Sequence, residues 1–291
     1  MRATAYVCTP RDWQWSKKTL DGNTLGPGQM FKDLRGVTFD EDQLVVCDKG
    51  NNIVQILSQD YTCETVLGSF SGQFAKPFNP RSVAISKGKL YFILDDNNLQ
   101  IVVCKKTNEI VRTFSLPADT DPWCIALVGK FVLVAEVDGH RVLKYTQDGE
   151  YMAEIGSHGQ GQTQFNNAFY MAVDSRDVIM VTDCNNYCIK CFDIDLKYLH
   201  QYGQYGEDEG QLRFTRGIAV DGDDNVYVCD VGNRRIVKWS SDGKWICNLF
   251  QRYVSQSWGI AVNATGDRIA IGLEQPGNEI TIFSKKTDTS L

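Results

Sequence analysis

Short runs of alternating apolar and polar residues fill the chain, and turns rich in Gly, Asn and Asp separate them. One passage, residues 216–250, reads RGIAVDGDDNVYVCDVGNRRIVKWSSDGKWICNLF and contains four such runs. Because β-branched and aromatic residues at a period of two favour extended backbone, each run predicts a strand of about five residues. No run has the apolar spacing of an amphipathic helix. The pattern therefore predicts an all-β protein.

The first strand of this passage recurs along the whole chain. Its last residue is, in order, Asp40, Ser86, Val128, Asp174, Asp221 and Asn263. Successive copies lie 46, 42, 46, 47 and 42 residues apart, a period typical of propeller blades or helical arrays. An acidic residue closes the second strand of each copy: Asp48, Asp95, Glu136, Asp183, Asp230 and Glu274. Four antiparallel strands in each of six units predict a six-bladed β-propeller.

The ends of the chain indicate how the ring closes. We expect the blades near residues 28–71, 72–116, 117–159, 160–207, 208–252 and 253–284 of a single domain, 1–291. The sixth unit lacks a fourth strand, because the sequence ends soon after EITIFS. Residues 13–22, with WSKKTLDG from Trp15 to Gly22, end like the fourth strands of the other units. This N-terminal strand is therefore predicted to complete the last blade, so that no sheet edge is left open there.

Several motifs of the repeat point to a known family. Gly72-Gln73-Phe74 and Gly210-Gln211 precede their units, and RGIAVD, NVYVCD, GNRRI and the turn Asp242-Gly243 follow. These motifs resemble NHL repeats, and the resemblance runs from about Gly28 to Phe283. A six-bladed ring of this kind resembles the NHL domain of TRIM-NHL proteins. It implies a platform that recognises protein substrates or RNA, with any ubiquitin-ligase activity residing in further domains of a longer parent chain.

One face of a propeller carries both the loops into the first strands and the loops between the second and third strands. The residue just before each first-strand core should lie at the channel mouth on that face. These residues are Arg35, Arg81, Trp123, Phe169, Arg216 and Trp258. Guanidinium groups bind phosphates or carboxylates, and aromatic rings stack on bases or pack against apolar side chains of a partner. We predict these six as ligand-binding residues, together with Lys49, Arg141, Tyr187 and Arg234 of the same loops.

The same residues have structural explanations. Arg35, Arg81 and Arg216 precede the acid of their own blade by 13 or 14 residues, which would let each arginine pair with that acid across two strands. The acids would alternatively accept backbone N–H bonds from the turns that follow them. The aromatic rings would serve equally well as channel-lining core. The sequence leaves these alternatives open.

Charge ranks the ligand classes. The chain has 30 Lys and Arg against 36 Asp and Glu, a net charge of -6, which argues against a broadly basic surface for nucleic acid. The loops of the predicted face also contain acids that would repel phosphates: Asp33, Asp96, Asp121 and Asp138. Protein substrates are therefore the first prediction and sequence-selective RNA binding the alternative. We expect no binding to DNA or to membranes, and a monomeric domain.

Catalytic and cofactor chemistry finds little support in the residue pattern. The histidines, His140, His158 and His200, fall in separate strands and loops and are not expected to converge on one zinc ion. Cys188 and Cys191 lie three apart on one predicted strand, so they should face opposite sides of it. All ten cysteines are expected to be reduced, and no leader or membrane-spanning run is evident. We expect a cytoplasmic binding domain without a cofactor, not an enzyme.

Overall fold

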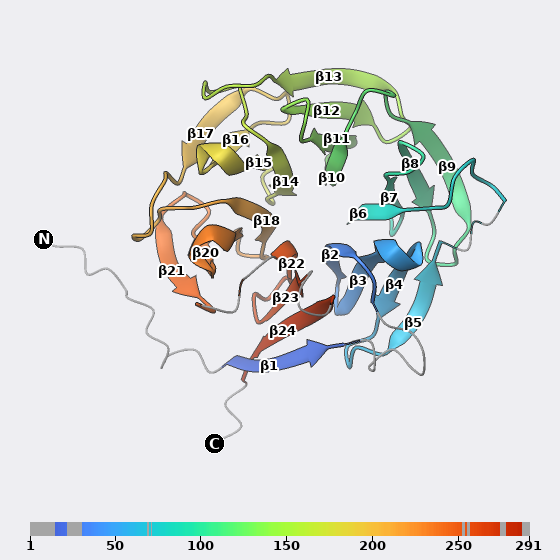
Figure 1. Cartoon of the computed structure of the whole chain (residues 1–291), viewed down its shortest axis with the longest axis horizontal. Helices are drawn as coiled ribbons and strands as arrows, with labels where there is room; N and C mark the ends of the chain where they lie inside the picture. Colours follow the sequence, from blue (N-terminus) through green and yellow to red (C-terminus); the bar gives the residue numbers. More distant parts are fainter. Residues whose placement is uncertain are drawn as a thin grey trace, which may run out of the picture.

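Six four-stranded antiparallel sheets surround a central channel in the computed structural model (Figure 1). The structure describes residues 15–21, 31–68, 70, 72–251, 254, 257–273 and 278–286. Each sheet is one blade, with its first strand beside the channel and its fourth strand at the rim. The predicted six-bladed β-propeller with four antiparallel strands per blade is therefore confirmed.

The first three blades follow one another along the chain. Blade one contains β2 (Leu34–Asp40), β3 (Gln43–Asp48), β4 (Ile53–Leu57) and β5 (Cys63–Leu67). Blade two contains β6 (Pro80–Ile85), β7 (Tyr91–Asp95), β8 (Gln100–Cys104) and β9 (Ile110–Ser115). Blade three contains β10 (Pro122–Val128), β11 (Phe131–Glu136), β12 (Arg141–Thr146) and β13 (Tyr151–Gly156).

The other three blades complete the circle. Blade four contains β14 (Ala168–Val173), β15 (Ile179–Asp183), β16 (Cys188–Phe192) and β17 (Tyr198–Tyr202). Blade five contains β18 (Thr215–Val220), β19 (Val226–Asp230), β20 (Arg235–Trp239) and β21 (Trp245–Leu249). Blade six contains β22 (Ser257–Val262), β23 (Arg268–Leu273), β24 (Glu279–Lys285) and β1 (Trp15–Leu20). Single 3₁₀ turns follow β3, β15 and β19: η2 (Lys49–Asn51), η3 (Cys184–Asn186) and η4 (Val231–Asn233).

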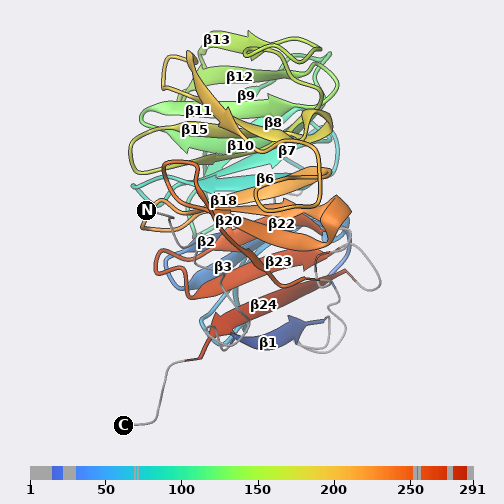
Figure 2. The same cartoon turned by 90° about the vertical axis from the view of Figure 1, so that its left-hand side faces the viewer.

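Strand β1 closes the ring, as predicted. It pairs antiparallel with β24, from Trp15 opposite Lys285 to Leu20 opposite Ile280, and Figures 1 and 2 both show the two strands side by side. The remaining positions of the predicted segment, residues 13, 14 and 22, lie outside the described residues. The Leu20 side chain is buried in a cluster formed by blades six and one, so β1 contributes to the core as well as to the sheet.

The acid that closes the second strand ties its blade together. Asp48, Asp95, Asp183 and Asp230 are fully buried, and each accepts a backbone N–H from the loop into its own first strand at 2.7–3.0 Å. Each also accepts the amide of an asparagine three residues further on, in the following turn. The acids therefore accept hydrogen bonds from loops of their own blades, and these backbone N–H donors lie in the loops into the first strands. Glu274 lies outside the described residues.

The pairing of arginines with these acids, one of the alternatives that the sequence left open, does not form at Arg35 and Arg81. Leu34, Pro80 and Thr215 lie opposite the acids Asp48, Asp95 and Asp230 in the strand register. Each arginine is the next residue along, within a local irregularity of the strand register. Arg35 pairs instead with Asp33, and Arg81 with Asp96 and Asp121.

The cysteines are mostly core residues. Of the nine within the described residues, all are free thiols, and only Cys63 is not fully buried. Burial raises the pKa of Cys184, Cys188 and Cys191 to about 12, so these thiols stay protonated at neutral pH. No helix in the described part of the chain is long and apolar enough to cross a membrane.

Candidate recognition face

The six residues predicted at the channel mouth form one continuous cluster of stacked side chains. The Trp123 ring contacts Phe169 edge-on at 5.1 Å between centroids and Trp258 at 5.3 Å. The guanidinium groups of Arg35 and Arg216 lie 4.6 and 3.6 Å from the centroid of Trp258. Arg81 lies 4.4 Å from the centroid of Trp123. We call Arg35, Arg81, Trp123, Phe169, Arg216 and Trp258 the mouth cluster.

Glycines next to the mouth cluster allow the blades to approach closely. A Cβ on Gly36, which follows Arg35, would lie 2.9 Å from the carbonyl oxygen of Arg81 in the next blade. A Cβ on Gly259, which follows Trp258, would lie 2.8 Å from the carbonyl oxygen of Arg35. Because real Cβ atoms do not come so near a carbonyl oxygen, these positions require glycine. The R-G and W-G pairs in the sequence thus bring the stacked side chains together.

Aspartates already pair with two of the three guanidinium groups. Arg35 forms a salt bridge with Asp33 at 2.6 Å. Arg81 contacts Asp96 at 2.8 Å and Asp121 at 3.2 Å, and it also donates to the carbonyl of Pro122. These arginine side chains are only 16% and 12% exposed, so the salt bridges are shielded from bulk water. The mouth cluster is therefore mixed in sign and partly neutralised from within.

The other four predicted site residues do not behave alike. Lys49 joins the mouth cluster, since it shares Asp96 with Arg81 at 2.9 Å. Arg141 instead pairs with Glu136 and with Glu154 on the outer strand β13, which makes it part of the blade framework. Tyr187 and Arg234 occupy the left-handed turn before their third strands, at φ +58° and +55°. These two lie in the turns between the second and third strands, and Tyr187 packs against Tyr205 and Phe214.

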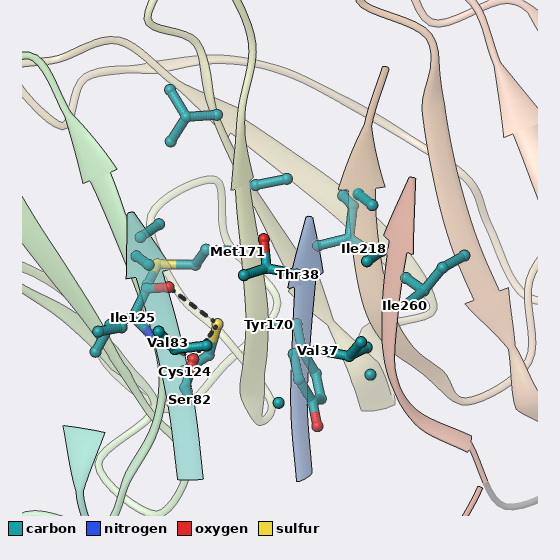
Figure 3. A pocket seen from close by; sticks show the side chains of 18 of the residues that line it. Val37, Thr38, Ser82, Val83, Cys124, Ile125, Tyr170, Met171, Ile218 and Ile260 are labelled. Carbon is teal, nitrogen blue, oxygen red and sulfur yellow. Dashed lines mark hydrogen bonds between the residues drawn. The ribbon is translucent and has the colours of Figure 1, made fainter. Parts of the chain in front are cut away.

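A channel of about 330 Å³ lies below the mouth cluster. The first strands of all six blades line it, and Figure 3 shows Val37, Val83, Ile125, Ile218 and Ile260 around it. Ser82 and Cys124 contribute polar atoms, but Ser82 is occupied in accepting the backbone N–H of Ile125 at 3.1 Å. The channel lining thus offers few side chains with acid or base chemistry.

Tyr170 lies where the channel meets the mouth cluster. Burial raises the pKa of its hydroxyl. A phenol in this state remains neutral at physiological pH. It acts as a polar contact beneath the aromatic rings and has no basic form available for proton abstraction.

Two histidines meet on the same face, which the sequence analysis did not anticipate. The rings of His140 and His158 are 4.7 Å apart, whereas His200 lies on β17, an outer strand. The Nδ1 atom of His140 accepts the backbone N–H of Asn167 at 3.0 Å, so the neutral ring carries its proton on Nε2. Burial and the neighbouring His158 lower the pKa of His140. Among the described residues, no group of three His, Cys, Asp or Glu side chains is placed to hold a metal ion.

Comparisons with known proteins support the fold. No protein-family model matches the sequence, and no curated protein sequence matches it. Virginiamycin B lyase from Staphylococcus aureus matches over 94% of this chain and 100% of its own, at 13% identity and a TM-score of 0.66. A protein of unknown function from Bacteroides thetaiotaomicron matches over 94% of this chain and 77% of its own, at 12% identity and a TM-score of 0.70.

A third similar structure is a catalytically inactive variant of the staphylococcal lyase, with a histidine replaced by alanine, solved with quinupristin. It is 14% identical, covers 94% of this chain and 100% of its own, and has a TM-score of 0.64. At such identities the likeness shows a shared propeller fold and does not carry the lyase chemistry over to this chain.

Proposed function

We propose that this propeller is a protein-interaction platform whose mouth cluster binds protein substrates. The observation that carries the proposal is the stacking of three arginines on indole rings, together with the salt bridges that two of these arginines form with aspartates. Tryptophan and arginine are the side chains most enriched at energetically dominant positions of protein interfaces. Here both types are gathered at the centre of one face and are already held in place.

The charge pattern of the cluster favours a protein over a nucleic acid. A phosphate that binds Arg81 must compete with the carboxylates of Asp96 and Asp121, which already pair with it. Since phosphate contacts supply most nucleic-acid affinity, each such carboxylate weakens binding. A protein partner brings both charge signs as well as apolar side chains, so it can match arginines, aspartates and rings together.

RNA binding is the second candidate. It is favoured by the contacts among Trp123, Phe169 and Trp258, because three neighbouring rings offer stacking surfaces for bases, worth about 1–3 kcal/mol for each stacked base. The resemblance to the propellers of TRIM-NHL proteins supports both candidates. It also supports the finer proposal that the platform selects targets for a ubiquitin ligase in the cytoplasm.

Peptide selection tests the platform. Peptides displayed on phage are selected on the wild-type domain, and a random RNA pool is titrated against it at 0.15 M salt. Selected peptides should bind Arg216→Gln at least about thirtyfold more weakly, since truncation at an interface hot spot costs about 2 kcal/mol or more. Arg176→Gln is the matched control, because Arg176 lies in the turn between β14 and β15, on the opposite face, paired with Asp174.

Two outcomes would overturn this ranking. Selected peptides that bind both variants equally would place the interface away from the mouth cluster. RNA binding that survives 0.15 M salt and is lost in Arg216→Gln would establish the second candidate instead. The ligase proposal has its own test: a reporter fused to a selected peptide should be ubiquitinated by the full-length gene product with E1 and E2 enzymes, and a reporter with the scrambled peptide should not.

A further inference from the structure

Three aromatic side chains, two of them exposed and one half-buried, lie together at the junction of blades four and five. Tyr187 contacts Tyr205 at 4.9 Å and Phe214 at 5.8 Å between ring centroids, edge-on in both cases. Tyr205 is 60% exposed and Phe214 is 45% exposed. Single exposed apolar residues are common, but a cluster of large exposed rings indicates an interaction surface. We call Tyr187, Tyr205 and Phe214 the aromatic triad.

The backbone under the triad is unusual for such residues. Tyr187 and Phe214 have φ values of +58° and +56°, in the left-handed region. This region suits Gly and Asn, and bulky residues adopt it at a cost of about 1–3 kcal/mol. In blade one the turn position that corresponds to Tyr187 is Asn52, at φ +59°. The rings of Tyr187 and Phe214 are therefore displayed at positions where the backbone favours a smaller residue.

Three acidic side chains follow the triad residue Tyr205 in the loop into blade five. Glu207, Asp208 and Glu209 are all exposed. The buried Arg235 fixes this loop, since it donates to the carbonyl oxygens of residues 207, 208 and 211 at 2.8–2.9 Å. Asp230 in turn holds Arg235 at 2.9 Å. The acidic loop is thus anchored through its backbone. Its carboxylates lie at the surface, where Glu207 forms an exposed salt bridge with Arg213 at 3.3 Å.

Blade four has the same framework without the acids. Lys190 donates to the carbonyl oxygens of Gly161 and Gln164, much as Arg235 does in blade five. His158 occupies the place of Tyr205, and each forms a parallel bridge across its loop. The loop of blade four reads SHGQGQTQF and contains no carboxylate. Of these two blades, blade five alone combines exposed rings with an acidic loop.

We propose that the aromatic triad and the acidic loop form a second recognition surface, which binds a lysine- or arginine-bearing segment of a protein partner. Aromatic faces attract cations, and the carboxylates of residues 207–209 add attraction over a longer range. The same carboxylates repel phosphates, so the surface disfavours nucleic acid. The proposal rests on the proposed protein-binding function, but it uses side chains outside the mouth cluster.

The test uses two labelled nine-residue peptides, one with three lysines spaced by glycines and one with three glutamates in their place. Fluorescence anisotropy should show binding of the lysine peptide only. Tyr205→Ala should weaken that binding about two- to fivefold, the usual effect of an exposed cation–π contact. The triple variant Glu207→Gln, Asp208→Asn, Glu209→Gln should weaken it about tenfold at 0.05 M salt and reduce its salt dependence.

A charge-matched control separates this surface from general attraction to an acidic protein. The triple variant Glu109→Gln, Asp148→Asn, Glu150→Gln removes three exposed carboxylates from loops between third and fourth strands, on the opposite face. It should bind the lysine peptide as the wild type does. Equal weakening by both triple variants, or no binding to the wild type, would overturn the proposal.

One further variant separates this proposal from the proposed function. Arg216→Gln should leave the binding of the lysine peptide unchanged while it weakens the phage-selected peptides. If the lysine peptide does not bind the wild type while the phage-selected peptides bind it and lose affinity in Arg216→Gln, the second surface alone is refuted. A lysine peptide that is lost in Arg216→Gln would place its site in the mouth cluster and refute the second surface as well.

Discussion

Removal of strand β1 should destabilise the whole ring cooperatively and not merely fray one blade. The perturbation is a deletion of residues 1–20, which takes away the six residues paired with β24. It leaves β24 as an open edge and exposes the cluster in which Leu20 is buried. Because each blade packs only on its two neighbours, a breach at blade six removes the closure that holds the remaining blades together.

The structure sets the size of the effect. Loss of the buried Leu20 side chain, 1% exposed, costs about 2–5 kcal/mol. The edge contact of Trp15 with Phe250, at 5.2 Å, adds about 1 kcal/mol. The deletion should therefore cost about 3–6 kcal/mol, against a total stability of about 5–15 kcal/mol for a domain. At roughly 2–4 °C for each kcal/mol, the thermal midpoint should fall by about 10–20 °C.

Circular dichroism and tryptophan fluorescence, followed through thermal unfolding, measure this change. The control is a circular permutant in which residues 15–21 are joined after residue 286 by a short loop. Trp15 lies opposite Lys285, so such a loop would form a hairpin, and the permutant should regain the wild-type midpoint. A deletion variant whose midpoint falls by less than about 3 °C, or whose loss of hydrogen-exchange protection is confined to β24, would refute the reasoning.

Three further predictions concern single side chains. Arg235→Ala should lower the free energy of unfolding in urea by about 3–5 kcal/mol, because it leaves the buried carboxylate of Asp230 without its charged partner. Arg235→Lys should cost clearly less, and equal losses in the two variants would show that the charge has no role there. Trp258→Ala should lower the free energy of unfolding by about 2–5 kcal/mol, since two guanidinium contacts and one ring contact are lost. Trp258→Phe should recover part of that free energy, and an unchanged free energy in Trp258→Ala would mean that the mouth cluster does not stabilise the fold. Burial and His158 lower the pKa of His140, so the folded state favours the neutral ring. The resulting stability is present above about pH 6.5 and is lost as the pH falls below it. The free energy of unfolding in urea should therefore decline less from pH 7.5 to pH 5.5 in His140→Asn than in the wild type, and an equal decline would contradict the assignment.

Sequence period and strand pattern were sufficient to predict the architecture. Every blade repeats the same order of strands and turns, so the number of blades follows directly from the number of copies of VTFD, VAIS and the later first strands. Closure followed from counting strands, since the sixth unit has three and the segment beginning at Trp15 supplies the fourth. Repetition also made the mouth cluster predictable, because equal positions in each unit lie at equal depth along the channel.

The partners of individual charged side chains could not be predicted in the same way. The spacing of Arg35 and Asp48 suggested a pair, but the first strand is irregular between Leu34 and Val37, and the register puts Leu34 opposite the acid. The partner of Arg35 is Asp33, only two residues away. A spacing of 13 residues cannot distinguish these outcomes, because a shift by one residue reverses the side to which a strand residue points.

The histidine pair and two residues of the aromatic triad, Tyr205 and Phe214, were missed for a different reason, whereas Tyr187 was among the predicted site residues. Both depend on the left-handed residue that ends the turn between the second and third strands, occupied by Asn52, Leu99, His140, Tyr187 and Arg234. The sequence contained a signal for them, since this residue directly precedes the third strand in each of these units. Aligning the blades on that position would have shown an aromatic ring or an imidazole where the backbone favours a small polar residue.

The mouth cluster and the aromatic triad should contribute differently to binding. In the cluster, a carboxylate of the ligand must displace Asp96 or Asp121 from Arg81, and this exchange of one carboxylate for another gains little free energy. Affinity there must come from apolar contact with Trp123 and Trp258, while the charges decide which ligands are accepted. At the triad, the exposed carboxylates act before contact is made, so they should raise the association rate in a salt-dependent way. A partner that spans both surfaces would thus lose association rate when the acidic loop is neutralised, and would dissociate faster when the stacked rings are truncated.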